Sequence, residues 1–178
     1  MEDNIIVDSS FTAVINAPLH AVDIPTWCFG LPDEEYQGCS PAHVAAGATT
    51  APDGRRMSIN VEVIGGTPMV QHYVEQLAEP HHLILQSVSD LFTAAGRTTM
   101  VVMWELSVTA IDDERCEFTN HVRTWPTEEF SAYLDRQGIP FEVFQAQRQP
   151  YSLAHNAGET PLFAASLERF ALRQAAGA

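Results

Sequence analysis

The feature that most constrains the fold is a series of turn dipeptides that divides residues 42–125 into short segments rich in β-branched and aromatic residues. Segments of this kind, separated by tight turns, are typical of consecutive β-hairpins. The pattern predicts six strands, the first three of them over 42–51, 55–64 and 68–78. The turns between the six strands fall at Asp53-Gly54, Gly65-Gly66, Pro80-His81, Ala95-Gly96 and Asp112-Asp113.

The segments on either side of the hairpins predict one more strand and several helices. A strand is expected from Phe11 to Asn16, and Pro25 is expected to stop the short helix that follows it, because proline has no N–H to donate. Thr160 and Pro161 are the residue types that open a helix. We therefore expect helices over 19–24, 33–38, 127–137 and 160–175, with a further helical piece over 141–158.

The length of the chain favours a single domain over residues 1–178, because 178 residues suffice for one substantial core. No apolar run approaches the roughly 20 residues that a membrane helix needs, so no membrane span is expected. The segment Met1-Glu2-Asp3-Asn4 is acidic and is not followed by an apolar h-region. We expect no secretory signal, and hence a cytoplasmic protein.

The charge of the chain argues against a nucleic-acid partner. Nine Lys and Arg against 23 Asp and Glu give a formal net charge of −14, which repels phosphate backbones. No phosphate-binding, dinucleotide-binding or zinc-protease motif occurs, and no cofactor is expected. The three cysteines lack metal-site spacing and are expected to be free thiols, at Cys28, Cys39 and Cys116.

The order of the predicted elements, one strand, two short helices, six strands and a long helical end, resembles the START-like superfamily, also called the Bet v 1-like or SRPBCC helix-grip fold. The segment Phe11-Thr12-Ala13-Val14-Ile15-Asn16-Ala17-Pro18 is similar to the first strand and Ala-Pro joint of many members. The resemblance implies an α+β domain in which a curved seven-stranded antiparallel sheet wraps around a long C-terminal helix. It also implies a cavity between them, used in the superfamily for lipids, polyketides, plant hormones and aromatic substrates of cyclases and hydrolases.

Alternation along the strands predicts which side chains line that cavity. If Asp53-Gly54 and Gly65-Gly66 are both two-residue turns, one face is apolar except for a histidine and is expected to point inward. This inward set is Met57, Ile59, Val61, Val63, Ala46, Ala48, Val70 and His72. The opposite face carries Arg56, Ser58, Asn60 and Glu62, and His43 also alternates outward. On the later strands the inward set is Leu83, Leu85, Ser87, Ser89, Met100, Val102, Trp104, Leu106, Val108, Phe118, Asn120 and Val122.

A few polar groups in an apolar cavity are typical of a small-molecule site. We expect the ligand to be a small hydrophobic or aromatic, polyketide-like molecule, with the C-terminal helix closing over it. The expected ligand-binding residues are His72, Ser87, Trp104, Asn120, Tyr151, His155 and Phe163.

Two pairs of residues have the spacing of catalytic or metal-binding groups. Glu105 lies opposite His121 across the last hairpin, but on the face that alternation assigns to solvent. His155 and Glu159 are spaced i, i+4, as a metal site on a helix requires. The chain is expected to hold no metal, and the alternative is a metal site formed by His72, His155 and Glu159. The resemblance to zinc-dependent carbon–carbon hydrolases of polyketide-derived phenols, which use two His and two Glu, supports the metal-site alternative. The ordinary reading is a capping or surface ion pair.

Three functions are therefore open at this point. The first is a binding or carrier protein, and the second is an enzyme of the same fold, a cyclase, dehydratase or zinc-dependent hydrolase with His72 or His155 as general acid or base. The third is an interaction module that meets a basic partner with its acidic exterior. No catalytic residue is assigned, and a homodimer is also open.

Overall fold

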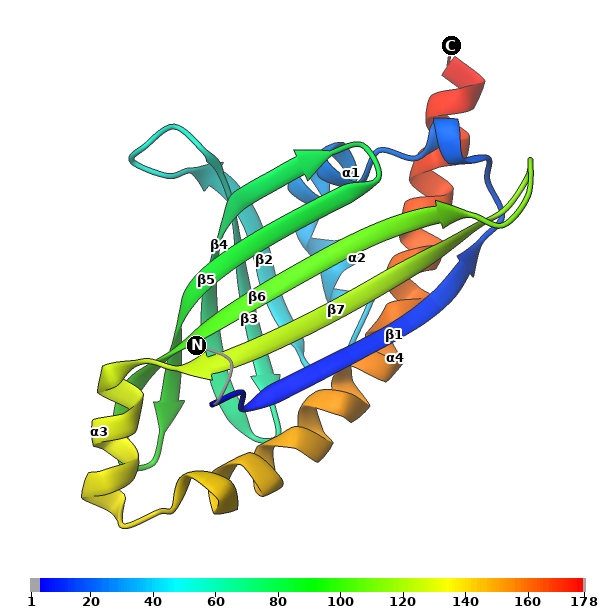
Figure 1. Ribbon diagram of the computed structural model, residues 1–178. Helices are drawn as coiled ribbons and strands as arrows, with labels where there is room; N and C mark the ends of the chain where they lie inside the picture. The colour runs from blue at the N-terminus through cyan, green and yellow to red at the C-terminus, as the bar shows by residue number, and fades with distance from the viewer. Residues whose placement is uncertain (1–3, 178) are drawn as a thin grey trace.

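The computed structural model describes residues 4–177 and has a seven-stranded antiparallel sheet in the order β1-β7-β6-β5-β4-β3-β2 (Figure 1). The strands are β1 (Val7–Ile15), β2 (His43–Thr50), β3 (Arg56–Ile64), β4 (Thr67–Glu79), β5 (His82–Thr93), β6 (Gly96–Ala110) and β7 (Cys116–Pro126). All six predicted hairpin strands and the preceding seventh are present. Residues 1–3 of the acidic N-terminus, on which the expected absence of a secretory signal rests, lie outside the described residues.

Three short helical segments follow β1: a 3-10 turn η1 (Leu19–Ala21), α1 (Ile24–Gly30) and α2 (Asp33–Gln37). The prediction that Pro25 ends a helix is wrong, because this proline lies in the first turn of α1. A first-turn residue needs no intrahelical N–H partner, and the side chain of Asp23 caps the helix by accepting from Thr26 N at 2.9 Å.

The chain ends in α3 (Glu128–Gln137), as predicted, and in one long helix, α4 (Phe141–Gly177). The predicted division near residue 160 is wrong, because α4 continues through Pro150 and Pro161. Thr160 does not act as an N-cap; its hydroxyl donates to the carbonyl of Asn156 at 2.6 Å inside the helix. The helix is held by packing on the sheet, since Phe163 and Leu167 are fully buried.

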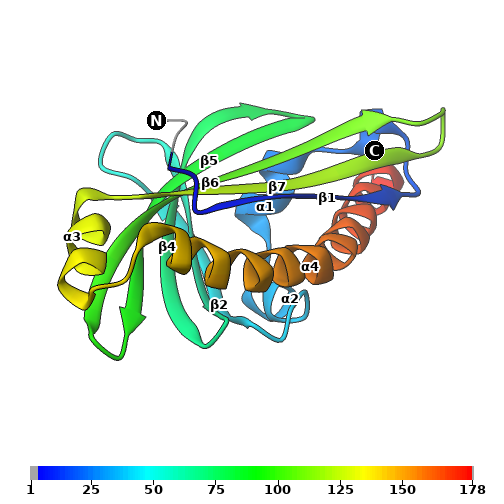
Figure 2. The ribbon, with the colours of Figure 1, turned by 60° about the horizontal axis from the view of Figure 1, so that its bottom comes forward.

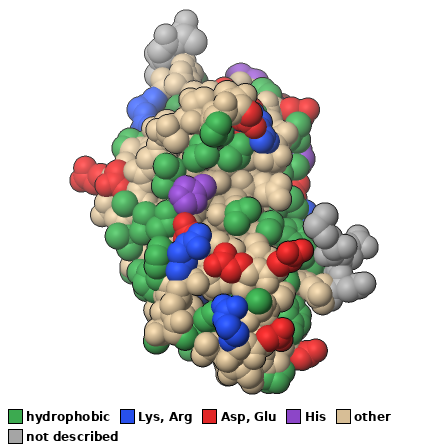
Figure 3. All heavy atoms as spheres, turned by 90° about the vertical axis from the view of Figure 1, so that its left-hand side faces the viewer, with side chains coloured by type: hydrophobic (Ala, Val, Ile, Leu, Met, Phe, Trp, Pro, Cys, Tyr) green, Lys and Arg blue, Asp and Glu red, His purple; other side chains and the backbone are tan. Residues whose placement is uncertain are grey.

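The arrangement of sheet and helices leaves one side of the sheet for a core and a site. Figure 2 shows α4 running along β1 across the open side of the curved sheet, with α1 and α2 on the same side toward β2. Within residues 4–177 no helix is both long and apolar enough to cross a membrane. On the surface drawn in Figure 3, charged side chains of both signs lie scattered among hydrophobic ones.

The inward faces of β5, β6 and β7 are as predicted. Their cavity-side residues are buried, including Leu85, Ser87, Trp104 and Asn120. Asp112-Asp113 lies in the predicted turn, and the pairing of Glu105 with His121 is confirmed.

The inward faces of β3 and β4 are the reverse of the prediction. Thr50 pairs with Arg56, because Pro52-Asp53-Gly54 forms a three-residue loop instead of a two-residue turn, with Gly54 at φ 88°. A change of one residue in register moves every side chain to the other face. The buried residues of these strands are Ser58, Asn60, Glu62, Ile64, Met69, Gln71 and Tyr73.

His43 is also on the opposite face from the predicted one. It pairs with Glu62, whereas Ala45 pairs with Val61, so a β-bulge lies between His43 and Ala45. A bulge inserts one extra residue and reverses the alternation beyond it. His43 is therefore turned inward and is buried.

Candidate metal centre and pocket

Four ionisable side chains, three of them buried and one half-buried, meet between the sheet and α4. His43 at the start of β2 and Glu62 on β3 face each other across the strands, while α4 supplies His155 and Glu159, one turn apart. The exposed fractions of His43, Glu62 and Glu159 are 7%, 6% and 5%. Three separate elements thus bring two imidazoles and two carboxylates together away from solvent.

The two imidazoles point the same nitrogen at the carboxylates. Glu159 Oε2 lies 3.0 Å from His43 Nε2 and 3.1 Å from His155 Nε2. Glu62 lies slightly further away, with Oε1 at 3.8 Å from His43 Nε2 and Oε2 at 3.7 Å from His155 Nε2. Both Nε2 atoms therefore face the space between the two carboxylates.

The other ring nitrogens are held by the surrounding structure. His43 Nδ1 lies 2.7 Å from the main-chain carbonyl of Tyr36, which can only accept, so this nitrogen carries the proton and donates. His155 Nδ1 lies 3.3 Å from the hydroxyl of Ser40. The neutral form of His43 therefore has a lone pair on Nε2, which points at the Glu159 carboxylate. Because this nitrogen and the carboxylate oxygen are both acceptors, either a second proton on His43 or a cation must lie between them.

Further hydrogen bonds orient the carboxylates. Asn120 Nδ2 donates to Glu159 Oε1 at 3.1 Å, and Asn120 Oδ1 accepts from Trp104 Nε1 at 2.8 Å. The hydroxyl of Tyr36 donates to Glu62 Oε1. These outer contacts fix the ligand-type oxygens in the way that surrounding groups support a metal site.

Burial and charge move the pKa values of the group in different directions. Burial raises the pKa of Glu62, and the charge of Glu159 adds to this rise. Burial acts the same way on Glu159, but hydrogen bonds from His155 and His43 outweigh it and hold the pKa of Glu159 below its usual value. Burial opposes protonation of His155, yet its hydrogen bond to Glu159 and the two carboxylate charges raise its pKa. The cluster therefore needs positive charge to balance it.

The donor set fits a divalent metal ion of the zinc type. Two imidazole nitrogens with carboxylate oxygens are a common zinc environment, and bonds of about 2.0–2.1 Å in a tetrahedron place ligand atoms about 3.3–3.4 Å apart. The four observed separations of 3.0, 3.1, 3.7 and 3.8 Å surround that value. His43, His155 and Glu159 offer ligand atoms that all lie within 4.8 Å of one another.

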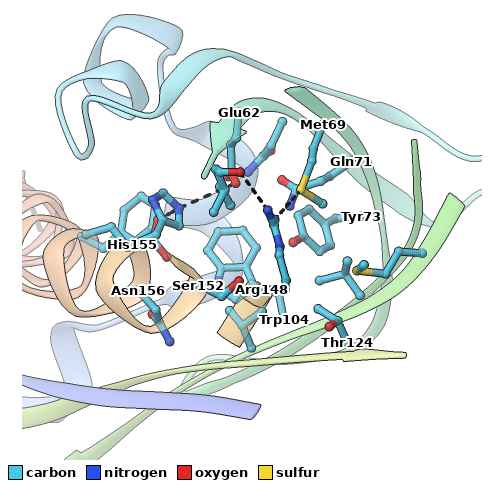
Figure 4. A pocket seen from close by; sticks show the side chains of 17 residues that line it. Glu62, Met69, Gln71, Tyr73, Trp104, Thr124, Arg148, Ser152, His155 and Asn156 are labelled. Atoms are coloured by element: carbon cyan, nitrogen blue, oxygen red, sulfur yellow. Dashed lines mark hydrogen bonds and ion pairs between the residues drawn. The ribbon is translucent and has the colours of Figure 1, made fainter. Parts of the chain in front are cut away.

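A pocket adjoins this cluster, and Figure 4 shows its lining. Glu62, His155 and Glu159 are part of the wall. Most of the remaining wall is apolar or aromatic and consists of Ile64, Met69, Tyr73, Met100, Val102, Trp104, Val122 and Phe163. The space is about 40 Å³, which is enough for a few water molecules. A ring-sized guest therefore requires side chains of the wall to move.

Solved structures of known proteins share this architecture. The aromatase/cyclase Zhui from Streptomyces sp. R1128 superposes with a TM-score of 0.61 over 94% of each chain at 10% identity. The di-domain aromatase/cyclase StfQ of the steffimycin pathway gives 0.61 over 98% of this chain and 53% of its own, again at 10% identity. Norcoclaurine synthase from Thalictrum flavum gives 0.52 over 94% of this chain and 95% of its own, at 13% identity.

The chain has the START-like, or Bet v 1-like, helix-grip fold. This confirms the resemblance inferred from the order of its elements. The chain spans about half the length of the di-domain StfQ. No protein-family model matches the sequence, and no curated protein sequence matches it.

The helix-grip fold brings together only some of the predicted ligand-binding residues. Trp104, His155 and Phe163 line the pocket, and Asn120 lies behind it, bonded to Trp104 and Glu159. Ser87 is buried, but its hydroxyl accepts from the main-chain N–H of His72 at 2.7 Å, away from the pocket wall.

Two of the expected residues point elsewhere. The inward orientation predicted for His72 is wrong, because Gln71 and Tyr73 hold the inward positions of β4. The residue that joins His155 and Glu159 is His43 instead. Tyr151 is 58% exposed, and its ring covers the turn at Gly65, where an added Cβ would lie only 2.8 Å from the ring. The Glu105–His121 pair lies on the outer face, as predicted.

Sequence reasoning missed His43, Glu62 and Tyr36. The alternation placed Glu62 among solvated residues, and a correct length for the 52–54 loop would have turned it inward. The bulge before Ala45 had no sequence signal that we recognise. The i, i+4 pair of His155 and Glu159 was the one part of the cluster that sequence spacing identified.

Proposed function

We propose that this helix-grip protein is a zinc-dependent hydrolase that acts on a small aromatic, polyketide-like ketone. The observation that carries the proposal is the cluster of His43, Glu62, His155 and Glu159, three of which line a largely apolar pocket while His43 lies behind its wall. Zinc-dependent carbon–carbon hydrolases of polyketide-derived phenols with the same superfamily fold also use two His and two Glu, which supports it further.

In this proposal the metal ion is held by His43, His155 and Glu159, and Glu62 lies beside it without holding it. A bound divalent ion supplies Lewis-acid polarisation of a carbonyl group and activation of water. The carbonyl of Tyr36 and the hydroxyl of Ser40 keep both Nε2 atoms directed toward the ion. Asn120 keeps Glu159 in place.

The apolar wall of the pocket binds the aromatic ring and excludes water. Trp104 packs against Phe163 with ring centroids 5.8 Å apart and against Tyr73 with centroids 5.3 Å apart. Such rings offer faces and edges to a flat guest. Because water is displaced from this wall, the interaction between the charges of the cluster and the substrate is screened less than it would be in water.

Glu62 is the residue suited to move a proton. Its pKa is raised by burial and by the charge of Glu159, and a raised pKa favours the protonated form that a proton-transfer residue must be able to reach. The hydroxyl of Tyr36 donates to it and holds it beside the cluster. In this proposal Glu62 accepts a proton from water and returns it to the aromatic ring carbon that loses the acyl group.

The alternative is a carrier that binds the same kind of molecule without converting it. The largely apolar pocket lined by Trp104 and Phe163 favours binding of an aromatic ligand in either case. The two functions differ in what they require of the buried cluster. A carrier has no need of two carboxylates and two imidazoles with their lone pairs converging.

The experiment uses protein purified without a histidine tag, stripped with a chelator and reloaded with zinc. With 2,4,6-trihydroxyacetophenone and water, hydrolysis breaks the ring–acyl bond and yields 1,3,5-trihydroxybenzene and acetate, both measurable by mass spectrometry. We expect turnover by the zinc form, loss of turnover in Glu159→Gln, and retention in His72→Ala, whose side chain lies on the other face of β4. Equal turnover by zinc form, stripped form and Glu159→Gln would contradict the proposal. Binding without turnover would favour the carrier.

A further inference from the structure

Arg148 is a buried cation that extends into the pocket from α4 (Figure 4). It is only 7% exposed. Its Nη1 donates to the main-chain carbonyl of Ile64 at 2.8 Å, and its Nη2 lies 3.0 Å from the sulfur of Met69. A guanidinium has five N–H groups, so these two contacts leave three for other partners.

The charge of Arg148 lacks a close partner within the described part of the chain. Among the described residues 4–177 it takes part in no ion pair, although the more distant charge of Glu62 acts on it. Burial lowers the pKa of Arg148 to about 10, which still leaves it charged at neutral pH. Buried charges in proteins are normally paired, because an unpaired one costs several kcal/mol. A thioether and one carbonyl are weak partners for such a group.

Within the part of the chain that the structure describes, two more polar groups of the same pocket have no hydrogen-bond partner. Gln71 Oε1 and Thr124 Oγ1 are buried without a hydrogen bond, and both residues line the wall. Gln71 is 4% exposed and Thr124 is 6% exposed. Buried polar atoms are almost always bonded in native proteins, so these two atoms of the pocket wall are available to accept or donate a hydrogen bond to a ligand or to water in the pocket.

Arg148 lies some distance along α4 from the cluster of His43, Glu62, His155 and Glu159. Arg148 precedes His155 by seven residues, which is about 10 Å along a helix axis. Both residues line the same pocket. A molecule about the size of a substituted aromatic ring can therefore reach Arg148 with one substituent while another lies at the cluster.

We propose that Arg148 binds an oxyanion on the substrate, a carboxylate or an ionised phenol on the ring, with Gln71 and Thr124 bonding neighbouring hydroxyl groups. The inference deepens the proposed function, on which it rests for the position of the reacting bond. Planar guanidinium groups bind carboxylates through two parallel N–H bonds, which adds orientation to affinity. The oxyanion would replace the sulfur of Met69 as a partner of Arg148, and this movement opens room for the ring.

The test is calorimetric binding of matched probes to zinc-loaded protein. The carboxylate probe is 2,4-dihydroxybenzoate and its neutral counterpart is 2,4-dihydroxybenzamide. The phenolate probe is 2,4,6-trihydroxyacetophenone, and its neutral counterpart is 2,4,6-trimethoxyacetophenone. Both are used with Glu62→Gln protein, which keeps the three residues that hold the zinc and lacks the proton acceptor needed for turnover. Preference for the first or the second anionic probe identifies the kind of oxyanion.

Arg148→Met should weaken binding of the preferred anionic probe about tenfold to a hundredfold and leave its neutral counterpart within about twofold. Arg148→Lys should keep part of the difference, and it guards against a Met variant that does not fold. Arg97→Met, at a residue 53% exposed in its side chain, is the matched surface control and should change nothing. Equal effects of Arg148→Met on charged and neutral probes would overturn the inference.

The two orphaned atoms give an independent readout. Thr124→Val and Gln71→Leu should each weaken binding of the hydroxylated probes about twofold to tenfold, because each removes one uncharged hydrogen bond. Unchanged affinity in both variants would overturn their part in the inference.

The inference and the proposed function fail in different ways. If the protein takes up no zinc but still prefers the anionic probe in a way that depends on Arg148, the proposed hydrolase function is contradicted and the oxyanion site is supported. If the protein binds zinc but its affinity for both anionic probes does not depend on Arg148, the inferred oxyanion site is contradicted and the proposed hydrolase function is unaffected.

Discussion

His43 and Tyr36 contact each other twice. Their rings stack with centroids 3.9 Å apart and an interplanar angle of 3°, and His43 Nδ1 donates to the main-chain carbonyl of Tyr36 at 2.7 Å. The helix α2 that carries Tyr36 thus sets both the plane of the imidazole and its tautomer. The tyrosine hydroxyl also donates to Glu62, so one residue of a five-residue helix orients two members of the cluster.

The first prediction concerns this hydroxyl. Tyr36→Phe keeps the stacking and the main-chain contact but leaves the buried Glu62 Oε1 without its donor. We expect the metal-free protein to lose about 1–3 kcal/mol of unfolding free energy. Urea denaturation measures it, with Tyr151→Phe as the control, because that hydroxyl belongs to an exposed side chain. Equal midpoints for Tyr36→Phe and the parent protein would show that the hydrogen bond contributes nothing.

The second prediction concerns Asn120, which bonds Glu159 on one side and Trp104 on the other. Asn120→Ala removes the group that positions Glu159, and outer partners of this kind are worth about tenfold to a hundredfold in metal affinity. Competition with a chromophoric zinc chelator gives the affinity. The control is Asn16→Ala, whose exposed amide donates to Glu168 far from the cluster. A zinc affinity of Asn120→Ala equal to that of the control would count against the assignment.

The third prediction concerns metal removal. A ligand that binds only the folded state stabilises it by RT ln(1 + [L]/Kd), about 2.7 kcal/mol at a hundredfold excess over Kd. Chelation should therefore lower the Tm of the parent protein measured in excess zinc. His155→Ala should show no such dependence, because it lacks one ligand. A Tm of the parent protein that is insensitive to both zinc and chelator would contradict the metal assignment.

Much of the fold was predictable because turn chemistry acts locally. Gly65 and Gly66, with φ of 58° and 78°, form the two-residue turn that their sequence requires, and Ile64 pairs with Thr67 as expected. The final helix was harder to predict. Pro161 is a strong local signal for a helix start, but burial of the residues that follow it on the sheet outweighs the local cost.

The site was less predictable than the fold, because it depends on single-residue shifts in register. One extra residue in the loop before Arg55 and one bulge before Ala45 decide that Glu62 and His43 face inward. The pattern of apolar and polar residues in the sequence does not indicate either of these two shifts in register. Only His155 and Glu159, which lie on one helix with fixed periodicity, were recognisable as a pair.

The central claim is that the buried cluster of His43, Glu62, His155 and Glu159 is a metal site, and metal stoichiometry tests it most directly. Protein purified without a tag and equilibrated with limiting zinc is analysed by elemental mass spectrometry beside His43→Ala and His72→Ala. The account predicts one zinc per chain in the parent protein and in His72→Ala, and a large loss in His43→Ala. The same zinc content in His43→Ala as in the parent protein, or no zinc in any of the three, would contradict it.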